Sequence, residues 1–393
     1  MTAPSAASVA VTDPVAGPSG RARDLFLVAN NIDELGGLQR VAHMLAELFA
    51  ARGHRVRLIG ARPFEPPHHY RSAGTTYTTH VLGERATPDG GGRRGAARLE
   101  QPTPQDIARL NELFESVPGG IVICMQIHAM NWVAEAKTSH LRVIGQSHES
   151  FAASVGVKGN RTSRFGRIMS LYPDIDFFLL LTRPDAEQFR RVGLNNTAVM
   201  PNPVTMRPDT PAALSSPTII TVGRVAPEKN HRDMIEAFAR LAPDHPEWTL
   251  KIFGDGPLRE VLDQQIRAAG LTDRVLLMGP TNDVERELLN ASMFALSSSA
   301  EGLPLVLVEA MACGVPCVSY DCSPGIREII TDGDDGIVVR QGSVDELSAG
   351  LRRLIDEPET RRAMGQQALV SSKRFAPDEV MQLWERFFDT VER

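Results

Sequence analysis

The feature that most constrains the fold is a regular alternation of short apolar segments with longer helical patterns. From Asp24 the chain reads as an apolar segment, DLFLVANNI, then a short loop, a helical pattern and a second apolar segment, HRVRLIGAR. This order predicts a β-α-β unit, and strands that are apolar throughout are typical of a parallel sheet covered on both faces. The alternation continues through GIVICMQI, LRVIGQSH and DFFLLLT. We therefore predict a parallel α/β sheet in the first half of the chain.

A second series of the same kind begins after residues 199–217, where five prolines and several small polar residues interrupt the pattern. Its predicted strands are PTIITVGR, TLKIFGD, RVLLMGP, MFALSSS, PCVSY and DGIVV. The repetition predicts two Rossmann-like, doubly wound domains in tandem, and 393 residues are long enough for both. Ligands of such folds bind at the carboxyl ends of the strands, so we expect the ligand in a cleft between the domains.

The predicted organisation has four parts, and the last of them is helical by pattern, as is the whole stretch from Val344 to Arg393. The parts are a disordered tail over residues 1–22, an N-terminal domain over 23–205, a C-terminal domain over 206–375 and a terminal helix over 376–393 that crosses back to the N-terminal domain.

Composition excludes several classes of protein. The net charge of -6 gives no general attraction to nucleic acid. The N-terminal segment lacks a basic start and is interrupted by Asp13 and Pro14, and no run reaches the ~18 apolar residues that span a bilayer. The four cysteines form no C-x-x-C pair, which disfavours structural zinc and indicates reduced thiols in a cytoplasmic protein.

A glycine pair, Gly36-Gly37, lies between the first predicted strand and the helix that follows it. Two glycines let a ligand approach the backbone closely, and the start of the helix offers free N–H groups to an anion. The alternative interpretation is ordinary loop geometry. Neither this loop nor Gly254-Asp255-Gly256, with Arg259 at the third glycine position, forms the G-x-G-x-x-G fingerprint of dinucleotide binding.

Two cations, Arg224 and Lys229, follow the first predicted strand of the second domain. An arginine fork and a lysine point charge on one short loop suit a bound diphosphate. The alternative is solvated surface charge, with Glu228 as the neighbour.

Two carboxylates, Glu301 and Glu309, flank an otherwise apolar segment that begins a helix near Pro304. At 1.5 Å per residue, Glu309 lies ~7–8 Å along that helix, so the two acids can contact different parts of one ligand. The amides of Gly302 and Leu303 stand near the helix start, where a phosphate is stabilised. A ligand with two hydroxyl pairs on either side of a diphosphate matches this arrangement.

The segment EGLPLVLVEAMACGVPCV resembles the E-x7-E motif of the retaining glycosyltransferases of the GT-B fold, family 4. The order of the glycine loop, the two cations and the two acids is similar over about residues 24–375. Two departures are GGLQRV where relatives often have GGAERV, and Pro304-Leu305 in place of Phe-Gly.

The resemblance implies a role for each motif. Glu309 would bind the ribose, Glu301 the donor sugar, and Arg224 with Lys229 the leaving diphosphate, without a metal ion. His148 matches the active-site histidine near the reacting face of the sugar, although a lone histidine at a strand end is often structural. The remaining donor-binding positions implied are Gly36, Gly37, Gly302, Leu303, Pro304 and Leu305 for phosphate, and Thr281 and Asn282 for the base.

The implied function is transfer of a hexose from a nucleotide donor, for which we expect UDP, to an acceptor hydroxyl with retention at the anomeric carbon, with the N-terminal domain binding the acceptor. We expect a role in cell-envelope polysaccharide, teichoic-acid-like polymer or glycolipid synthesis. A nucleotide-sugar 2-epimerase of the same fold and a non-catalytic nucleotide-sugar binder stay open as alternatives. A nicotinamide oxidoreductase is disfavoured because the glycine fingerprint is missing.

A basic segment, residues 157–167, contains Lys158, Arg161, Arg164 and Arg167 with no acidic residue. Together with Arg93 and Arg94 it would suit peripheral contact with an anionic membrane or polymer at the inner face of the membrane. The alternative is a solvated loop.

Overall fold

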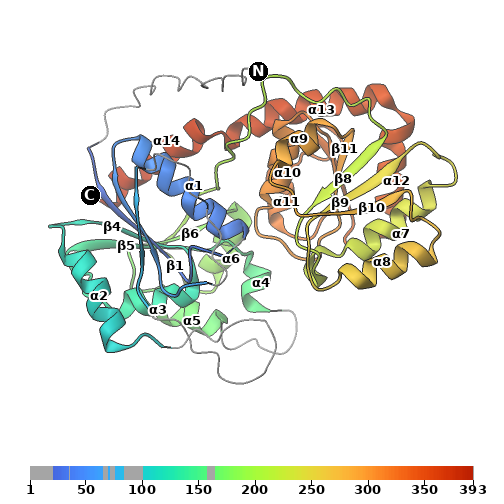
Figure 1. Cartoon of the computed structure of the whole chain (residues 1–393). Helices are drawn as coiled ribbons and strands as arrows, with labels where there is room; N and C mark the ends of the chain where they lie inside the picture. Colours follow the sequence, from blue (N-terminus) through green and yellow to red (C-terminus); the bar gives the residue numbers. More distant parts are fainter. Residues whose placement is uncertain are drawn as a thin grey trace, which may run out of the picture. The chain divides into compact units, whose positions relative to one another are not determined.

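The protein is described here by a computed structural model of the chain (Figure 1). It describes residues 21–34, 36–64, 70, 76–83, 101–156 and 164–392. The predicted disorder of the tail therefore lies almost wholly outside the described residues, as do Arg93, Arg94, Lys158 and Arg161 of the basic surface. The chain divides into two compact units, Met1–Ile123 with Ala136–Leu141, and Cys124–Glu135 with Arg142–Arg393. The predicted domain boundary at residues 205–206 stays a prediction.

The first sheet has seven strands in the order β3-β2-β1-β4-β5-β6-β7. Its paired strands run parallel, with Asp24 opposite Arg55 and Ile144 opposite Phe177. The strands are β1 (Asp24–Ala29), β2 (Arg55–Gly60), β3 (Thr78–Val81), β4 (Gly120–Cys124), β5 (Leu141–Gln146), β6 (Phe177–Leu180) and β7 (Thr197–Val199). The two outermost strands, TTHV and TAV, were absent from our sequence prediction because neither is an apolar run.

Helices alternate with these strands, as predicted, and several begin at residues that cap them. Thr103 forms a capping box with Asp106, and Thr182 accepts a hydrogen bond from the amide of Asp185. The helices are α1 (Gly37–Ala51), α2 (Pro104–Glu115), α3 (Ile127–Glu135), α4 (Phe151–Val155), α5 (Arg164–Leu171) and α6 (Arg183–Arg191).

The second sheet has six strands in the order β10-β9-β8-β11-β12-β13, and its pairings are parallel. Its strands are β8 (Thr218–Val222), β9 (Thr249–Phe253), β10 (Val275–Gly279), β11 (Met293–Leu296), β12 (Cys317–Tyr320) and β13 (Gly336–Val339). All six were predicted from the sequence. The order, with β8 and β11 in the centre, is that of a doubly wound fold.

Alternate residues of these strands enter two separate cores. Ile219 packs in a cluster with α7 (His231–Leu241), α8 (Arg259–Ala268) and α12 (Val344–Asp356), whereas its neighbour Ile220 packs with helices on the other face. Those helices are α9 (Val284–Leu289), α10 (Leu305–Ala312), α11 (Pro324–Ile329) and α13 (Pro358–Ser372). Figure 1 shows the two helical layers. Full burial of each isoleucine contributes roughly 1.5–3 kcal/mol.

The end of the chain is helical, as predicted, through α12, α13 and α14 (Pro377–Val391). Pro358 and Pro377 stand in the first turns of the last two helices, where a missing N–H costs no hydrogen bond. Phe387 of α14 contacts Phe177 of β6 edge-to-face, with ring centroids 5.1 Å apart.

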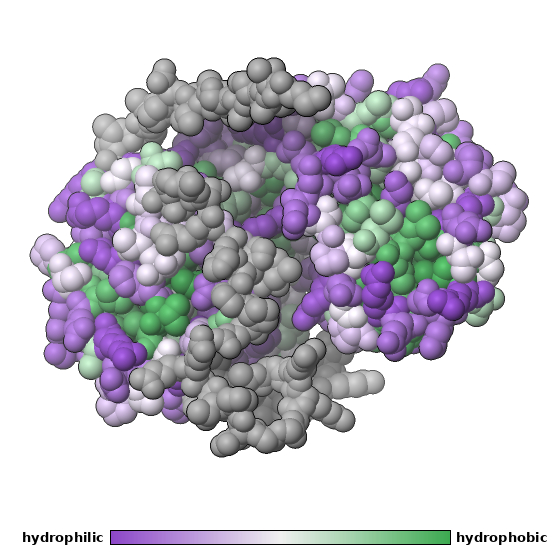
Figure 2. Space-filling model, viewed as in Figure 1, coloured by the Kyte–Doolittle hydropathy of each residue, from purple (hydrophilic) through white to green (hydrophobic). Residues whose placement is uncertain are grey.

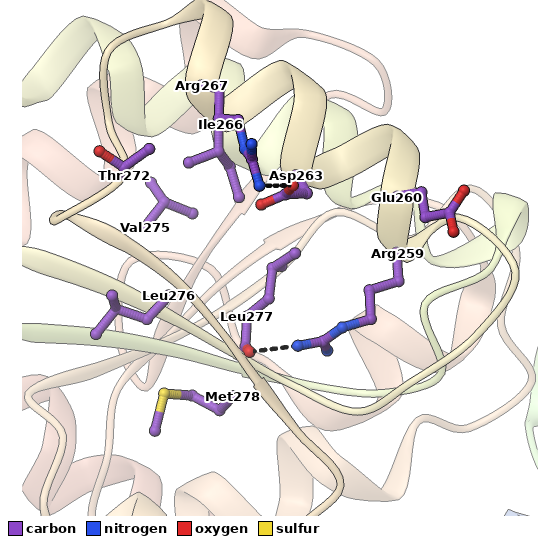
Figure 3. Close-up of a pocket in the computed structure, with 10 residues that line it drawn as sticks. All are labelled: Arg259, Glu260, Asp263, Ile266, Arg267, Thr272, Val275, Leu276, Leu277 and Met278. Atoms are coloured by element: carbon purple, nitrogen blue, oxygen red, sulfur yellow. Dashed lines mark hydrogen bonds and ion pairs between the residues drawn. The ribbon is translucent and has the colours of Figure 1, made fainter.

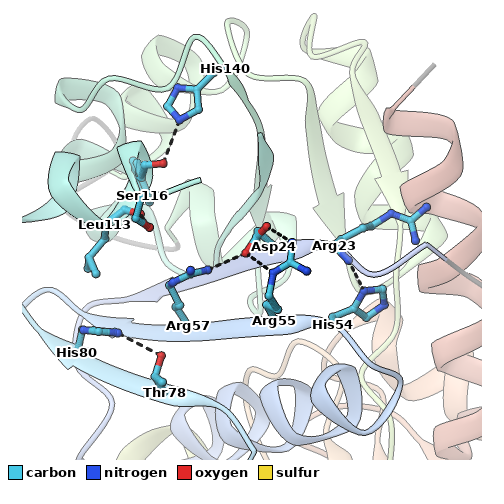
Figure 4. A network of polar contacts seen from close by, with 11 residues as sticks. Arg23, Asp24, His54, Arg55, Arg57, Thr78, His80, Leu113, Ser116 and His140 are labelled. Carbon is cyan, nitrogen blue, oxygen red and sulfur yellow. Dashed lines mark hydrogen bonds and ion pairs between the residues drawn. The ribbon is translucent and has the colours of Figure 1, made fainter. Parts of the chain in front are cut away.

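An ion cluster around the buried Asp24 lies at the amino ends of β1 and β2 in the first unit (Figure 4). Asp24, 5% exposed, accepts hydrogen bonds from Arg55 Nε at 3.0 Å, Arg55 Nη2 at 2.5 Å and Arg57 Nη1 at 3.0 Å. The hydrogen bond from Arg55 lowers the pKa of Asp24, and Arg57 adds to this, while burial opposes it. The carboxylate is thus fully engaged within the protein.

Candidate functional site

The helix that carries Glu309 is apolar on nearly every side. Leu307, Val308, Ala310 and Met311 are buried, and so is Glu309, at 5% exposed. Glu309 is the only buried glutamate among the residues that the structure describes. Burying an ionised carboxylate costs several kcal/mol unless it is paired or hydrogen-bonded, about 2–7 kcal/mol even for neutral polar groups. A carboxylate at this position therefore needs a partner, and Glu309 does interact with other groups of the protein.

The start of α10 differs by one residue from the prediction. Pro304 is the N-cap residue, and the helix begins at Leu305 rather than at Pro304. Glu309 is accordingly the fifth residue of the helix, as predicted. Glu301 and Gly302 lie in the loop between β11 and α10, at the carboxyl end of β11.

An ion pair joins two of the predicted motifs. Lys229 Nζ lies 2.6 Å from Glu301 Oε1, and their side chains are 24% and 11% exposed. Lys229 ends the short 3-10 helix Pro227–Lys229 that follows β8, which is the central neighbour of β11. Two segments that are far apart in the sequence thus bring opposite charges together at the carboxyl edge of the second sheet.

Serines after β11 hold the cationic loop in place, and our sequence analysis missed them. Ser297 Oγ donates to the carbonyl oxygens of Lys229 and Asn230 at 3.2 and 3.0 Å. The amide of Ser299 donates to the carbonyl oxygen of Glu228 at 2.8 Å. The available signal was the polar run SSS at the end of an otherwise apolar strand.

Arg224 behaves differently from Lys229. Its side chain is 69% exposed, and its Nη2 lies 2.5 Å from Glu228 Oε1. This contact is the surface pair of the alternative interpretation, so without a ligand Arg224 takes the position expected of solvated charge. The flexible side chain stands on the same loop as Lys229.

His148 follows β5 and is partly buried, with its Nε2 atom shielded from solvent. Burial lowers its pKa to about 4, so the imidazole is neutral near pH 7. Nδ1 lies 3.2 Å from Asn202 Nδ2, and with the amide donating, the imidazole proton stands on Nε2. Nε2 has no hydrogen-bond partner among the described residues. The segment after β5 therefore carries a neutral imidazole whose N–H donor has no partner among the described residues.

Glycines allow unusually close backbone contact around these loops. A Cβ on Gly302 would lie 2.2 Å from the carbonyl oxygen of His148, and one on Gly325 would lie 1.9 Å from the carbonyl oxygen of Gly302. Gly254, at φ +130°, approaches Gly223 in the same way, with 1.9 Å from its Cβ position to the Gly223 oxygen. Gly254 and Gly256, which do not form a dinucleotide-binding fingerprint, thus allow close packing against the loop that carries Arg224. We did not predict this role.

The glycine loop lies in the first unit. Gly36 is the N-cap residue of α1, and its amide donates to Tyr70 Oη at 2.7 Å. Tyr70 Oη also lies 2.7 Å from the carbonyl oxygen of Glu34. A Cβ on Gly37 would contact nothing within 4 Å, so packing does not require glycine there. Leu35 lies outside the described residues.

The predicted base-contacting residues follow β10. Thr281 is half-buried and its Oγ1 accepts a hydrogen bond from the amide of Asp283 at 3.1 Å, while Asn282 is exposed. The turn leads directly into α9, whose N-cap residue is Asp283.

A cavity of about 890 Å³ lies between α8 and the edge strand β10, and no residue of the predicted site lines it (Figure 3). Arg259 Nη2 donates to the carbonyl oxygen of Leu277 at 2.9 Å, and Arg267 pairs with Asp263 at 2.7 Å. Arg259, which occupied the third glycine position of the rejected fingerprint, thus binds the edge strand. Met278 is 46% exposed, and apolar surface is visible over β10 in Figure 2.

Comparison with known families identifies the chain. Residues 36–204 match the model "Glycosyl transferase 4-like domain", and residues 205–370 match "Glycosyl transferases group 1". The chain is a family 4 glycosyltransferase with the GT-B fold. The predicted family, the fold of two parallel α/β sheets and the enzyme class are therefore confirmed, and the enzyme takes its sugar from a nucleotide donor.

Similar proteins include both characterised and uncharacterised enzymes. An uncharacterized glycosyltransferase of Haemophilus influenzae is 27% identical over 359 residues, 90% of this chain and 97% of that protein. An exopolysaccharide phosphotransferase of Streptomyces coelicolor is 39% identical over 223 residues, 55% of this chain. The matched part is only 23% of that relative's length. The solved structure of Anabaena HepE with UDP-glucose has a TM-score of 0.75 at 16% identity, covering 94% of this chain and 100% of that one.

Two further properties concern the described part of the chain. None of its helices is long and apolar enough to cross a bilayer. None of its His, Cys, Asp and Glu side chains gather in a group of three or more that could hold a metal ion. All four cysteines are free, and burial raises the pKa of Cys124 and Cys313 to about 12, which makes these thiols unreactive.

Proposed function

We propose that the enzyme transfers a hexose from a UDP-linked donor to an acceptor hydroxyl, with retention at the anomeric carbon. The observation that carries the proposal is the contact of Lys229 with Glu301 beside the start of α10, where Glu309 is buried further along the same helix. The UDP-glucose bound to Anabaena HepE supports the choice of nucleotide.

Each carboxylate has a separate role in this proposal. Glu309 accepts hydrogen bonds from the ribose hydroxyls, and Glu301 from a hydroxyl of the donor sugar. The amides of Gly302, Leu303 and Leu305 stand around the amino end of α10, and with Pro304 shaping the turn they bind the diphosphate. Thr281 and Asn282 contact the base. We further propose Gly36 and Gly37 as donor-binding residues.

Charge development explains the two cations. Cleavage of the anomeric C–O bond leaves negative charge on the diphosphate and positive charge on the sugar ring. Lys229 is already fixed by Glu301 and by the serines behind its loop, so it needs little reorganisation to stabilise the leaving group. Arg224 is exposed and paired only on its own loop, so it closes on the diphosphate once the donor is bound. We propose that no metal ion is needed.

His148 is neutral, and its Nε2 hydrogen is free to donate to a sugar hydroxyl near the reacting carbon. No side chain of the described site is placed as a covalent nucleophile. We propose that the departing phosphate accepts the proton of the acceptor hydroxyl on the same face of the sugar.

The acceptor belongs, in our proposal, to cell-envelope polysaccharide, teichoic-acid-like polymer or glycolipid synthesis. The exopolysaccharide phosphotransferase of Streptomyces coelicolor, which the chain matches over part of its length, supports this area of metabolism. We propose residues 23–205 as the acceptor-binding domain, 206–375 as the donor-binding domain and 376–393 as the helix that crosses back. The enzyme would work in the cytoplasm, with peripheral contact at the inner face of the membrane.

A screen of nucleotides by thermal shift tests the donor. UDP, GDP and ADP, each free and as the glucose conjugate, are added to purified protein at equal concentrations. A ligand at 100 times its Kd adds about 2.7 kcal/mol to the free energy of unfolding, so the UDP series is expected to raise the melting temperature most. A larger shift with GDP or ADP would refute the UDP assignment.

Product analysis separates the alternatives. Transfer to an acceptor gives a new glycoside, whose anomeric configuration NMR compares with that of the donor. A 2-epimerase would instead return the nucleotide sugar inverted at C2 with no acceptor consumed. A non-catalytic binder would release no UDP from UDP-glucose.

A further inference from the structure

A second cavity, of about 290 Å³, lies among α3, α4 and α5 in the second unit. Its charged and polar lining comes from His128 of α3, Ser154 of α4, and Arg164 and Arg167 of α5. None of the described residues that line it is acidic. The volume is at the lower end of the ~300–1,000 Å³ typical of ligand pockets, so it suits a small group rather than a whole nucleotide sugar.

The cations of this cavity are held in place. Arg167 Nη1 lies 2.7 Å from His128 Nδ1, and because a guanidinium only donates, the imidazole accepts there and is neutral. Burial lowers the pKa of His128, and the charges of Arg167 and Arg164 lower it further. The contact occupies one of the five N–H donors of Arg167, so the remainder of its fork can bind a further group.

Arg164 forms an ion pair with Glu149, and the two side chains are 42% and 46% exposed. This pair is accessible to water, which makes it weak and readily exchanged for a stronger partner. Arg164 is thus paired with the one carboxylate of Glu149, while Arg167 contacts the neutral His128, so the two arginines leave an excess of positive charge at the cavity.

The cavity is close in the sequence to the predicted reaction centre. Glu149 directly follows His148, and α4, which supplies Ser154, begins at Phe151. Ser150 caps α4 by accepting a hydrogen bond from the amide of Ala153 at 3.3 Å, which fixes this segment relative to His148. A group bound in the cavity would thus be held beside the chain segment that carries the histidine.

We propose that this cavity is a subsite for a phosphate group carried by the acceptor. Arginine forks match the geometry of phosphate oxygens and bind them through two parallel hydrogen bonds. The neutral His128 offers its Nε2 hydrogen as a further donor. The inference rests on the proposed function for the identity of the ligand as an acceptor, whereas the anion site itself does not depend on it.

Binding of inorganic phosphate tests the site without any turnover. Full-length protein with ¹⁵N-labelled histidine is titrated with phosphate at constant ionic strength, and the imidazole resonances of His128 are followed. We expect a saturable shift, with the pKa of His128 raised because a nearby anion favours its charged form. In Arg167→Gln we expect at least a roughly ten-fold weaker affinity, the usual effect of losing one hydrogen bond from a charged group.

The matched control is Arg191→Gln, since Arg191 is a 77% exposed cation of the same unit that does not line the cavity. It is expected to bind phosphate like the wild type. Arg164→Gln provides a second variant at a more exposed position, should Arg167→Gln fail to fold. The proposal would be overturned if wild type, Arg164→Gln and Arg167→Gln bound phosphate with equal affinity. It would also be overturned if sodium chloride shifted the His128 resonances of the wild type as much as phosphate does.

Two further arms identify the source of the phosphate. If glycerol 3-phosphate competes with inorganic phosphate for the site, the source is a soluble or polymeric phosphate ester. If the wild type binds to phosphatidylglycerol vesicles and Arg167→Gln does not, the source is a lipid headgroup. If neither competes with inorganic phosphate, the assignment to an acceptor is wrong. The rise in melting temperature caused by UDP is measured alongside in wild type and Arg167→Gln, and it is expected to be the same in the two proteins. Its absence in both would refute the proposed function and leave the anion site unaffected.

Discussion

Two acids in this molecule, one buried and one partly buried, have different surroundings. Asp24, at the amino end of β1, accepts three hydrogen bonds from two arginines, and its lowered pKa reflects that saturation. Glu301, at the carboxyl end of β11, has one hydrogen-bonding partner among the described residues, Lys229, which stands on a separate loop. Pairing with an opposite charge is common to both acids. The difference lies in the hydrogen-bond donors that remain nearby. Asp24 is saturated by its two arginines, whereas the second unit also holds the exposed Arg224 and the unpartnered Nε2 of His148.

The comparison shows that a buried carboxylate alone does not indicate a binding site. The amino ends of parallel strands provide stability, while the carboxyl ends carry the loops that bind ligands. Mutations around Asp24 should therefore lower the free energy of unfolding, whereas mutations around Glu301 should lower turnover.

The largest expected effect is on turnover in Lys229→Ala. Loss of one preorganised cation at the leaving group is expected to reduce kcat by about 10²–10³, and the measurement is UDP release with UDP-glucose and acceptor. Lys373→Ala, at an exposed cation of the same unit, is the matched control and should keep full kcat. Unchanged turnover in Lys229→Ala would remove the leaving-group assignment.

His148→Gln should change the acid stability of the protein. The pKa of His148 is lowered to about 4 in the folded protein, against about 6.5 when unfolded, so the wild type loses stability as pH falls between these values. The loss amounts to about 3 kcal/mol at pH 4 and vanishes above pH 7. Urea unfolding of both proteins at pH 7.5 and pH 4.5 measures it. If wild type and His148→Gln lost the same free energy of unfolding between pH 7.5 and pH 4.5, His148 would not be held neutral by burial.

Asp24→Asn should act on stability alone. Removing the charge is expected to cost about 1–3 kcal/mol at pH 7, because both arginines lose a charged acceptor. Since the pKa of Asp24 is lowered in the folded state, this contribution is present above the unfolded pKa and disappears as pH falls through the folded one. Chemical unfolding at pH 7 and pH 3 checks the trend, and kcat is expected to be unchanged. A fall in kcat comparable with that of Lys229→Ala would erase the distinction between the two regions.

The smallest effect on the free protein is expected in Arg224→Ala. Its ion pair with Glu228 is exposed, so the free energy of unfolding should change by less than about 0.5 kcal/mol. Affinity for UDP is nevertheless expected to fall, because Arg224 closes on the diphosphate only when the donor is present. Calorimetry of UDP binding measures this, and an unchanged Kd would show that Arg224 stays a surface charge.

Much of this architecture was predictable because apolar runs and helical periods record burial directly. All six strands of the second sheet and the helical end of the chain were predicted in this way. The edge strands β3 and β7 were not, since TTHV and TAV form by pairing with a neighbour rather than by their own apolarity.

The motifs of the site were predictable from residue type and spacing, but the state of each charge was not. Lys229 and Arg224 look alike in sequence, yet one is fixed by Glu301 and the other is solvated. That difference depends on the contacts between the loops after β8 and β11, and the polar run SSS after β11 does not by itself show which cation these serines hold in place. The packing roles of Gly254 and Gly325 likewise depend on segments distant in the chain.

The close approach of Gly302 to His148 and of Gly325 to Gly302 restricts how this enzyme can evolve. Neither glycine has room for even a methyl group, so a change of sugar preference cannot pass through positions 302 or 325. Divergence must instead use the adjacent side chains Leu303, Pro304 and Leu305, of which the last two already depart from the usual pattern. The close glycine contacts keep the backbone of these loops constant while those neighbours vary.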